Sequence, residues 1–483
     1  MSDGINNNFK LKRKYSNYNR LIQFVFVIII IFFVFCLSIT EERHKNLISF
    51  SSEINLVIIG KGNQNLIFSD FTPQPSQVFV EGNLRDSCTI SCELENEESN
   101  VKLIFDGIIR YTQAMFYTLD NLKEIDLSNF DFSNVISMKF MFQMCINLEK
   151  VEFGNIITSN VVNMAQLFYE CNKLESVDVS KFDTSKVTDM QGMFYNCFSL
   201  STIDLSNFIT SNVENIRIFL YNCYSLNSID VSKFDTSKVA NMEGMFYNCS
   251  SLKSIDLSNF NTSNVENLRI FLYNCYGLNS IDISSKFDTS NVNTMEAMFY
   301  NCSSLKSIDL SNFNTQKVNT FRLMFYNCIE LISIDVSNFD TSNVISMHLM
   351  FYNCSSLLSI NVSHFNTKNV ESIYGLFYNC NKLTTLDVSN FDTSKVTDIE
   401  FLFYNLTNLE SIDISNFNIT KIESLKAMFY NCEKLTTIDI YIFFRYFENK
   451  RFFIFFLWMF ITEIIRFIKN GHFICNNNGC FIL

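Results

Sequence analysis

The sequence predicts an α/β solenoid, a right-handed stack of coils with a parallel β-sheet on one face and short helices on the other. A small β-rich cap and an N-terminal transmembrane helix are expected before the stack. Three observations predict this fold: a motif that recurs every 26 residues, a change from alternating to near-helical apolar spacing inside each motif, and a long uncharged stretch near the start of the chain.

A recurring cysteine marks the repeat. One unit is MFYNCSSLKSIDLSNFNTSNVENLRI, residues Met245–Ile270. The spacing is 26 residues except between Cys275 and Cys302, where it is 27 because one serine is added at 284–285. We assign 13 units to residues 113–443, and residues 193–244 nearly duplicate residues 245–297. The cysteines that share this position are Cys145, Cys171, Cys197, Cys223, Cys249, Cys275, Cys302, Cys328, Cys354, Cys380 and Cys432.

Each unit predicts a strand, a turn and a helix. Alternation over Ile255–Leu257 places Ile and Leu inward and Asp256 outward, as in a short strand. The polar residues 261–263 predict a turn and a helix N-cap. Beyond them, apolar residues recur at near-helical spacing, which predicts a helix of about three turns; they are Val265, Leu268, Leu272 and Cys275.

The region before the repeats, residues 50–112, is interpreted as a β-rich cap for the first coil, because a solenoid needs its end covered. Its β-branched and aromatic runs predict short strands. These are Ile54–Gly60, Gln64–Phe68, Ser76–Gly82 and Asn100–Phe105.

The start of the chain predicts a membrane anchor. Residues 1–20 are basic and residues 21–40 are uncharged, which is long enough to span a bilayer. The excess of Lys and Arg before the span predicts a cytoplasmic N-terminus and extracellular repeats, in a single-pass protein of the cell surface. A cleaved signal peptide, which would give a secreted form, is the alternative.

The tail, residues 444–483, is hydrophobic and loses the repeat pattern. Four interpretations stay open: an amphipathic segment at a membrane surface, an atypical helical cap, a second membrane helix, and an end that is wrongly translated from an intron or a frameshift.

Composition argues against two classes of function. The net charge is −12, so we expect no nucleic-acid partner, since phosphate contacts need a basic surface. The four histidines are scattered without metal-ligand spacing, and we find no Gly-rich phosphate loop and no nucleophile motif. We therefore expect no enzyme, no catalytic residues, no cofactor and no dedicated metal site.

The cysteines of the repeat are interpreted as buried thiols rather than bridges between coils. Equivalent side chains in a stack point the same way, which makes the disulfide dihedral difficult to reach. Outside the repeats, Cys88 and Cys92 are candidates for a disulfide.

An acid recurs on the predicted strand, and we name this column the acidic ladder. Carboxylates about 5 Å apart repel one another, so we expect some of their pKa values to rise. The ladder is a candidate site for a basic partner, and Ca²⁺ is a second, weaker candidate. The alternative is that each Asp bonds nearby Ser hydroxyls and only keeps the sheet hydrated. The candidates are Asp178, Asp204, Asp230, Asp256, Asp282, Asp309, Asp335, Asp387 and Asp413.

Several N-x-S/T sequons are candidate glycosylation sites in a secretory protein. Sequons at Asn248, Asn301 and Asn353 lie in the repeated YNC string and are interpreted as ladder residues instead. The glycosylation candidates are Asn261, Asn361, Asn405 and Asn418.

The repeats resemble leucine-rich repeats of the BspA surface-protein family, in the mycoplasma-lipoprotein-like form. That form has the string FDTSxVxxMxxMFxxCxxLxxLDLSxF, which residues 182–208 match with Ile203 in place of one leucine. The resemblance implies a surface protein for adhesion or macromolecular recognition, with a protein or glycan partner on another cell or matrix. A structural coat or spacer protein without a selective ligand is the alternative.

Overall fold

The computed structural model describes residues 51–283, 286–436, 473–476 and 479–482. Residues 53–105 and 109–483 form one compact unit, and residues 1–52 and 106–108 form the other. Only residues 51–52 and 106–108 of the second unit are described, so the account below concerns the first.

The region before the repeats contributes strands to two sheets, and the larger sheet also includes β7 and β8 of the first two coils. The larger sheet has the order β4-β3-β6-β1-β7-β8, and the smaller pairs β2 with β5. Strand β1 alternates buried and partly exposed residues along its length, as expected for one face on a core. The strands are β1 (Ser51–Ile59), β2 (Gly62–Asn65), β3 (Gln77–Val80), β4 (Asn83–Leu84), β5 (Ser91–Leu94), β6 (Glu98–Asp106), β7 (Leu122–Asp126) and β8 (Lys150–Glu152).

Three of the four predicted strands largely coincide with β1, β3 and β6, and the fourth, Gln64–Phe68, overlaps β2 only at its first two residues. Strand β1 pairs antiparallel with β7 of the first coil, with Leu56 opposite Ile125, and β7 pairs in parallel with β8 of the second coil. The free edge of the first coil is thereby hydrogen-bonded, which is what a cap of a solenoid must achieve.

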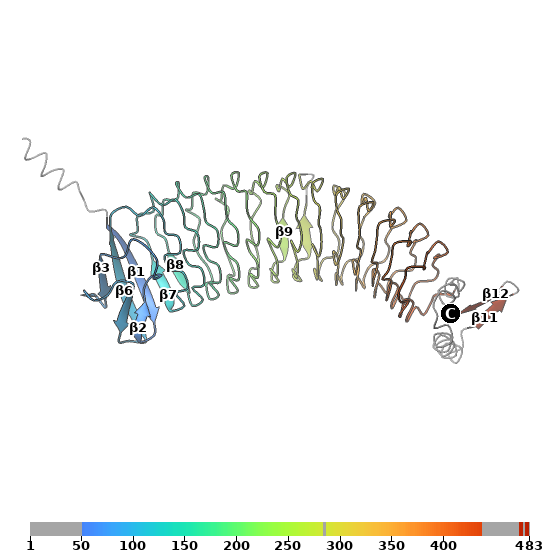
Figure 1. Ribbon diagram of the computed structural model, residues 1–483, viewed down its shortest axis with the longest axis horizontal. Helices are drawn as coiled ribbons and strands as arrows, with labels where there is room; N and C mark the ends of the chain where they lie inside the picture. Colours follow the sequence, from blue (N-terminus) through green and yellow to red (C-terminus); the bar gives the residue numbers. More distant parts are fainter. Residues whose placement is uncertain (1–50, 284–285, 437–472, 477–478, 483) are drawn as a thin grey trace, which may run out of the picture. The chain divides into compact units, whose positions relative to one another are not determined.

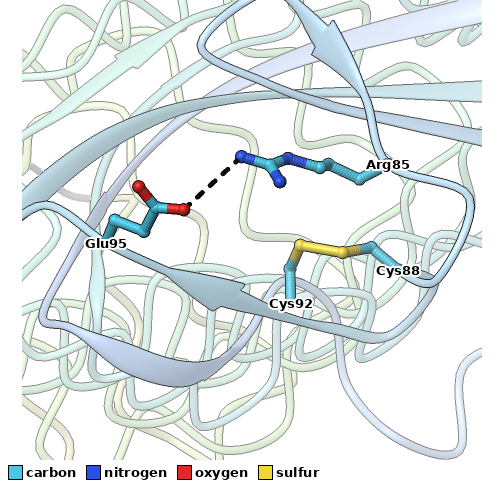
Figure 2. The surroundings of a disulfide bond; sticks show 4 residues. All are labelled: Arg85, Cys88, Cys92 and Glu95. Atoms are coloured by element: carbon cyan, nitrogen blue, oxygen red, sulfur yellow. Dashed lines mark ion pairs between the residues drawn. A yellow bond between two sulfur atoms is a disulfide. The ribbon is translucent and has the colours of Figure 1, made fainter.

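The smaller sheet carries the predicted disulfide candidates. Cys88 and Cys92 are joined by a disulfide with a Cα–Cα distance of 4.9 Å, and Cys92 lies on β5 (Figure 2). Nearby, Arg85 Nη2 lies 4.0 Å from Glu95 Oε1, and both side chains are well exposed.

After β8 the chain forms successive coils that lie side by side (Figure 1). Strands β9 (Ser254–Asp256) and β10 (Ser280–Asp282) pair in parallel and in register, with Asp256 opposite Asp282. Elsewhere neighbouring coils are joined by single parallel bridges, such as Ser176 to Thr202 and Asn215 to Asn241. The predicted parallel sheet is therefore reduced to short pieces.

The described residues contain no helix, so the prediction of an α/β solenoid is wrong in its helical part. Two residues, four apart, are left-handed in each coil, from Ala114 and Thr118 to Ala427 and Asn431. Within the segment predicted to be helical, Ile270 and Asn274 have φ values of 52° and 59°. Left-handed residues end a right-handed helix.

Backbone hydrogen bonds show what replaces the helix. Met245 N and Tyr247 N each donate to the carbonyl three residues back, at 3.2 and 3.1 Å, and so form consecutive turns. Gly244 N and Phe246 N, which alternate with these two donors along the chain, donate to the next coil, to Arg269 O and Phe271 O, both at 3.1 Å. Turns begin at Met242, Phe246 and Cys249, whose side chains are buried, so apolar residues recur at spacings of four and three. The same spacings occur along one face of a helix, which explains why the sequence mimics one.

No helix in the described part of the chain is long and apolar enough to cross a membrane. This finding contradicts the predicted transmembrane helix and, with it, the predicted location as a single-pass surface protein with a cytoplasmic N-terminus and extracellular repeats. Residues 21–40, on which that prediction was based, lie outside the described residues.

The interior of the array consists of columns of equivalent side chains. Phe116, Phe142 and Phe168 stack with centroids 5.6 and 5.5 Å apart. The recurring cysteines are free thiols, and each Sγ donates to a carbonyl of the preceding coil, as Cys249 does to Leu220 O at 3.2 Å. The interpretation of these residues as thiols rather than bridges is confirmed.

In the tail, β11 (Phe473–Asn476) and β12 (Gly479–Ile482) form an antiparallel pair. Residues 437–472, which carry most of the segment given four interpretations above, lie outside the described residues.

Candidate binding surface

The acidic ladder is exposed and follows the coils. All nine of its aspartates are exposed, and the parallel register of β9 and β10 places Asp256 beside Asp282. The residues on either side of most of these aspartates, such as Ile255 and Leu257, are buried, whereas Ile229, Ile281 and Ile283 are partly buried. The alternation of the short strand therefore projects the carboxylates outward, as the sequence predicts.

Eight of the nine carboxylates accept a hydrogen bond from the serine two residues on, and the serine that follows Asp282 lies outside the described residues. In Asp178, Oδ1 accepts hydrogen bonds from Ser180 N at 3.0 Å and from Ser180 Oγ at 2.6 Å. Asp230 and Asp387 repeat this pair of contacts with the serine two residues on. Such Asx turns occupy one carboxylate oxygen and bend the backbone away from the strand.

These hydrogen bonds set the protonation state. The serine hydroxyl first, then its N–H, lowers the pKa of Asp178, Asp204, Asp230 and Asp387. The N–H comes first for Asp309, Asp335 and Asp413, whose pKa values are lowered too. Neighbouring aspartates act in the opposite direction, but they are a smaller influence. The expectation that repulsion raises pKa values is therefore wrong for these seven residues, which stay ionised.

Basic side chains lie near part of the ladder. Lys181 helps to lower the pKa of Asp178, and Lys233 does so for Asp204 and Asp230. The described residues contain no group of three or more His, Cys, Asp or Glu side chains that could hold a metal ion. The ladder therefore presents separate carboxylates, an arrangement that suits an extended basic partner better than a Ca²⁺ ion, which takes six to eight converging oxygens.

The glycosylation candidates fall into two kinds. Asn361 and Asn418 are exposed, and each Oδ1 accepts hydrogen bonds from its own sequon hydroxyl, at 2.8 and 2.7 Å. The Oδ1 of Asn261, which is partly buried, accepts from Ser263 N at 3.2 Å. Asn405 instead donates its Nδ2 to Asn379.

Asn405 belongs to a column that the sequence only hinted at, the asparagine of the YNC string. Asn222 donates to Asn196 at 2.8 Å and Asn248 donates to Asn222 at 3.0 Å. Further along the stack, Asn301 donates to Asn274 at 3.0 Å. Each of these asparagines is the second of the two left-handed residues of its coil. An amide that donates and accepts along the stack explains the recurring asparagine.

Tyrosines form a second column that sequence reasoning missed. Their rings stack with centroids 4.0–4.9 Å apart. Burial raises the pKa of Tyr300 to about 12. The tyrosine of the YNC string was the available signal, and its members are Tyr169, Tyr195, Tyr221, Tyr247, Tyr273, Tyr300, Tyr326, Tyr352, Tyr378, Tyr404 and Tyr430.

A third column alternates in charge. Glu243 lies between Arg217 and Arg269, at 2.8 and 2.9 Å. Glu296 likewise contacts Arg269 at 3.3 Å and Arg322 at 2.7 Å. The near-duplication of residues 193–244 in 245–297 produces this alternation, because it repeats the charge every second coil.

The fold and surface define a solenoid repeat protein whose coils are built from columns of identical polar and apolar residues. A family model described as "Mycoplasma protein of unknown function, DUF285" matches residues 110–229, 199–306, 248–359, 273–383 and 354–441. These matches cover more than half of the chain, so the chain belongs to this family. The resemblance to mycoplasma-type repeats is confirmed at that level.

No curated protein matches the chain. Among solved structures, a leucine-rich repeat protein from Eubacterium ventriosum is 17% identical over 65% of this chain and 84% of that chain, with a TM-score of 0.35. A similarity of that size does not bear on function.

Proposed function

We propose that this chain is a BspA-type repeat protein whose array recognises a macromolecular partner, a protein or glycan on another cell or matrix, through the acidic ladder. The observation that carries the proposal is the column of exposed aspartates whose pKa values are lowered by their own serines. Fixed, ionised carboxylates repeated along a surface favour a partner with repeated positive charge.

Binding is a better account than catalysis. The thiols of the repeat are buried, and burial raises the pKa of Cys275 to about 12, which makes them poor nucleophiles. The buried hydroxyls of the threonine column, such as Thr184, are engaged with backbone groups of the next coil.

A structural coat or spacer remains the second candidate. It is favoured by the fact that every Asx turn of the ladder also satisfies the backbone N–H of a serine, so the aspartates have a use without any ligand.

The test asks whether attachment depends on the charge of the ladder or only on the turns that its side chains form. The triple variant Asp204→Asn, Asp230→Asn and Asp256→Asn removes three charges and keeps the turns, because the natural Asn361 accepts from Ser363 in the same way. We expect attachment of beads coated with the full chain to polylysine and to cultured cell monolayers to weaken by about tenfold.

The control is a triple variant at another Asx position, Asp183→Asn, Asp235→Asn and Asp288→Asn. It changes the net charge equally, and Asn314 and Asn366 hold that turn in natural coils. If both triple variants attach like the unmodified chain, the ladder is not a recognition surface and the coat function stands. Equal weakening by both would assign attachment to net charge alone.

A further inference from the structure

One coil of the array departs from its neighbours at three exposed positions in and around the acidic ladder. The ladder position of this coil is Asn361, with Leu358 three residues before it and His364 three residues after it, and all three are exposed. In most other coils the ladder position is an aspartate, the earlier position is polar or charged, and the later one is asparagine or lysine. We name this segment, residues 354–365, the ladder break.

The preceding coil adds a second aliphatic side chain. Ile332 is equivalent to Leu358, and the two residues are 44% and 54% exposed. Leu358 N donates to Ile332 O at 3.0 Å, so they are neighbours across adjacent coils. The flanking coils have Lys306 and Thr384 in this column, which limits its apolar part to the two coils.

The ladder around the break lacks the lysines that accompany its first half. Lys181 and Lys233 help to lower the pKa values of aspartates there. Around the break, the aspartates have their pKa values lowered by their own serines, and His364 adds to this effect at Asp335. Asparagine replaces the two lysines in these coils, at Asn312, Asn338, Asn390 and Asn416. The carboxylates around the break are thus not offset by a lysine at that position.

The order along the array is charge, apolar pair, charge. Asp309 and Asp335 precede the break, Asp387 and Asp413 follow it, and Asn361 between them is neutral. Neighbouring strands are about 4.8 Å apart, so the outer two of these aspartates each lie about 9.6 Å from Asn361 along the stack. An extended peptide advances about 3.3 Å per residue, so about three of its residues cover that distance.

We propose that the ladder break binds a polypeptide segment in which aliphatic side chains are flanked on both sides by lysine or arginine. The aliphatic side chains pack on Ile332 and Leu358, and the basic side chains pair with ladder aspartates in the coils on either side. Leu358 lies at most about 10 Å from Asn361, so one segment can reach both. Because Asn361 is neutral, no carboxylate has to be desolvated beside the apolar contact.

This inference rests on the ladder function proposed above and narrows its partner to a protein. The test measures binding of three synthetic peptides to the full chain by fluorescence polarisation. The first peptide has two leucines between two pairs of lysines, the second has serines in place of the leucines, and the third has serines in place of the lysines. We expect the first to bind about tenfold more tightly than the second, and the third to show no measurable binding.

The double variant Ile332→Thr and Leu358→Thr installs the residue that Thr384 supplies in the following coil. It should weaken binding of the first peptide by about tenfold and leave binding of the second unchanged, because only the apolar contact is lost. The matched control is Ile345→Thr, at a position that is 50% exposed and lies beyond the turn closed by Val344 N and Thr341 O. This control should bind both lysine peptides like the unmodified chain.

Equal binding of the two lysine peptides to the unmodified chain overturns this inference and leaves the ladder function in place, whereas binding of neither overturns both. Equal loss of the first peptide in the double variant and in Ile345→Thr also overturns the inference. So does binding of the third peptide as tight as that of the first, since the charges would then have no part. Self-association in sedimentation that only the double variant abolishes would assign the apolar pair to a second copy of the chain and overturn the inference as well.

Discussion

The buried threonine column offers a direct measure of what holds one coil to the next. Thr341 is 1% exposed, and its Oγ1 donates to Asn366 O at 3.0 Å and accepts from Asn366 N at 2.7 Å. One hydroxyl therefore satisfies both backbone groups of a residue in the following coil. Thr341→Val keeps the shape of the side chain and removes both hydrogen bonds.

The magnitude follows from the two groups left without a partner. Each unsatisfied buried group costs about 1–3 kcal/mol, so we expect Thr341→Val to lower the free energy of unfolding by about 2–4 kcal/mol. Thr341→Ser keeps the hydroxyl and loses one methyl group, which costs about 1 kcal/mol. The exposed Thr188, which donates to Val162 O at 3.3 Å, supplies the control Thr188→Val, with an expected loss of about 0.5 kcal/mol or less.

Urea unfolding of the three variants measures the global effect, and hydrogen exchange of the Asn366 amide measures the local one. Local exchange is needed because long repeat arrays do not always unfold as one cooperative unit. The Asn366 amide should exchange much faster in Thr341→Val than in Thr341→Ser. If the valine variant is as stable as the serine variant, the threonine column acts by packing and not by hydrogen bonding.

Three further predictions concern charge and thiols. Glu243→Gln, which weakens two ion pairs, should lower the free energy of unfolding by about 1 kcal/mol at low salt and by less in 1 M NaCl, whereas Glu214→Gln at an exposed position should have no effect in urea unfolding. Because burial raises the pKa of the Cys328 thiol to about 12, iodoacetamide at pH 8 should label it only after unfolding, as peptide mass spectrometry would show; labelling of the folded chain would contradict its burial. The pKa of Asp335 is lower in the folded chain than in the unfolded chain, where it is near 3.9, so its ionised form stabilises the fold above that pH and the contribution is lost as the pH falls through the folded pKa. Ser337→Ala removes one of the hydrogen bonds that lower this pKa, so thermal unfolding followed by circular dichroism should show reduced stability at pH 6 but not at pH 2.

The repeat, the cap strands and the buried thiols could be read from the sequence because each follows from a local pattern. The helix could not, because apolar spacings of three and four arise both in a helix and in consecutive turns. The distinguishing signal was the asparagine of the YNC string. Asn248 and Asn274 tolerate the left-handed conformation better than most residues, and they occupy it here. A left-handed residue in every coil is incompatible with three helical turns.

The ionised ladder was not predictable from spacing alone, because the outcome depends on which interaction is stronger. Carboxylates about 5 Å apart at the surface repel through water, where the interaction is weak. The hydrogen bonds from Ser180 to Asp178 are short and made to the charged form. The motif D-x-S recurs in every member of the ladder, and it was the available signal for a lowered pKa.

The columns of this array follow one rule about which side chains can repeat in register. Asparagine both donates and accepts and tyrosine rings stack, so each can meet its equivalent in a neighbouring coil, as Asn222 does with Asn196. Threonine instead bonds the backbone of the next coil, as Thr184 does with Ile209. Charged groups cannot, because a charge repels its own copy. The chain meets this constraint in two ways: the ladder aspartates whose serines are described, such as Asp178, are bonded within their own coil, and Glu243 alternates with arginines because the duplicated segment is two coils long. If the charged column were displaced by one coil, Arg would face Arg, whereas a displacement by two coils would restore the Arg–Glu pairs. These ion pairs therefore distinguish displacements of an odd number of coils from the native pairing, but not displacements of an even number.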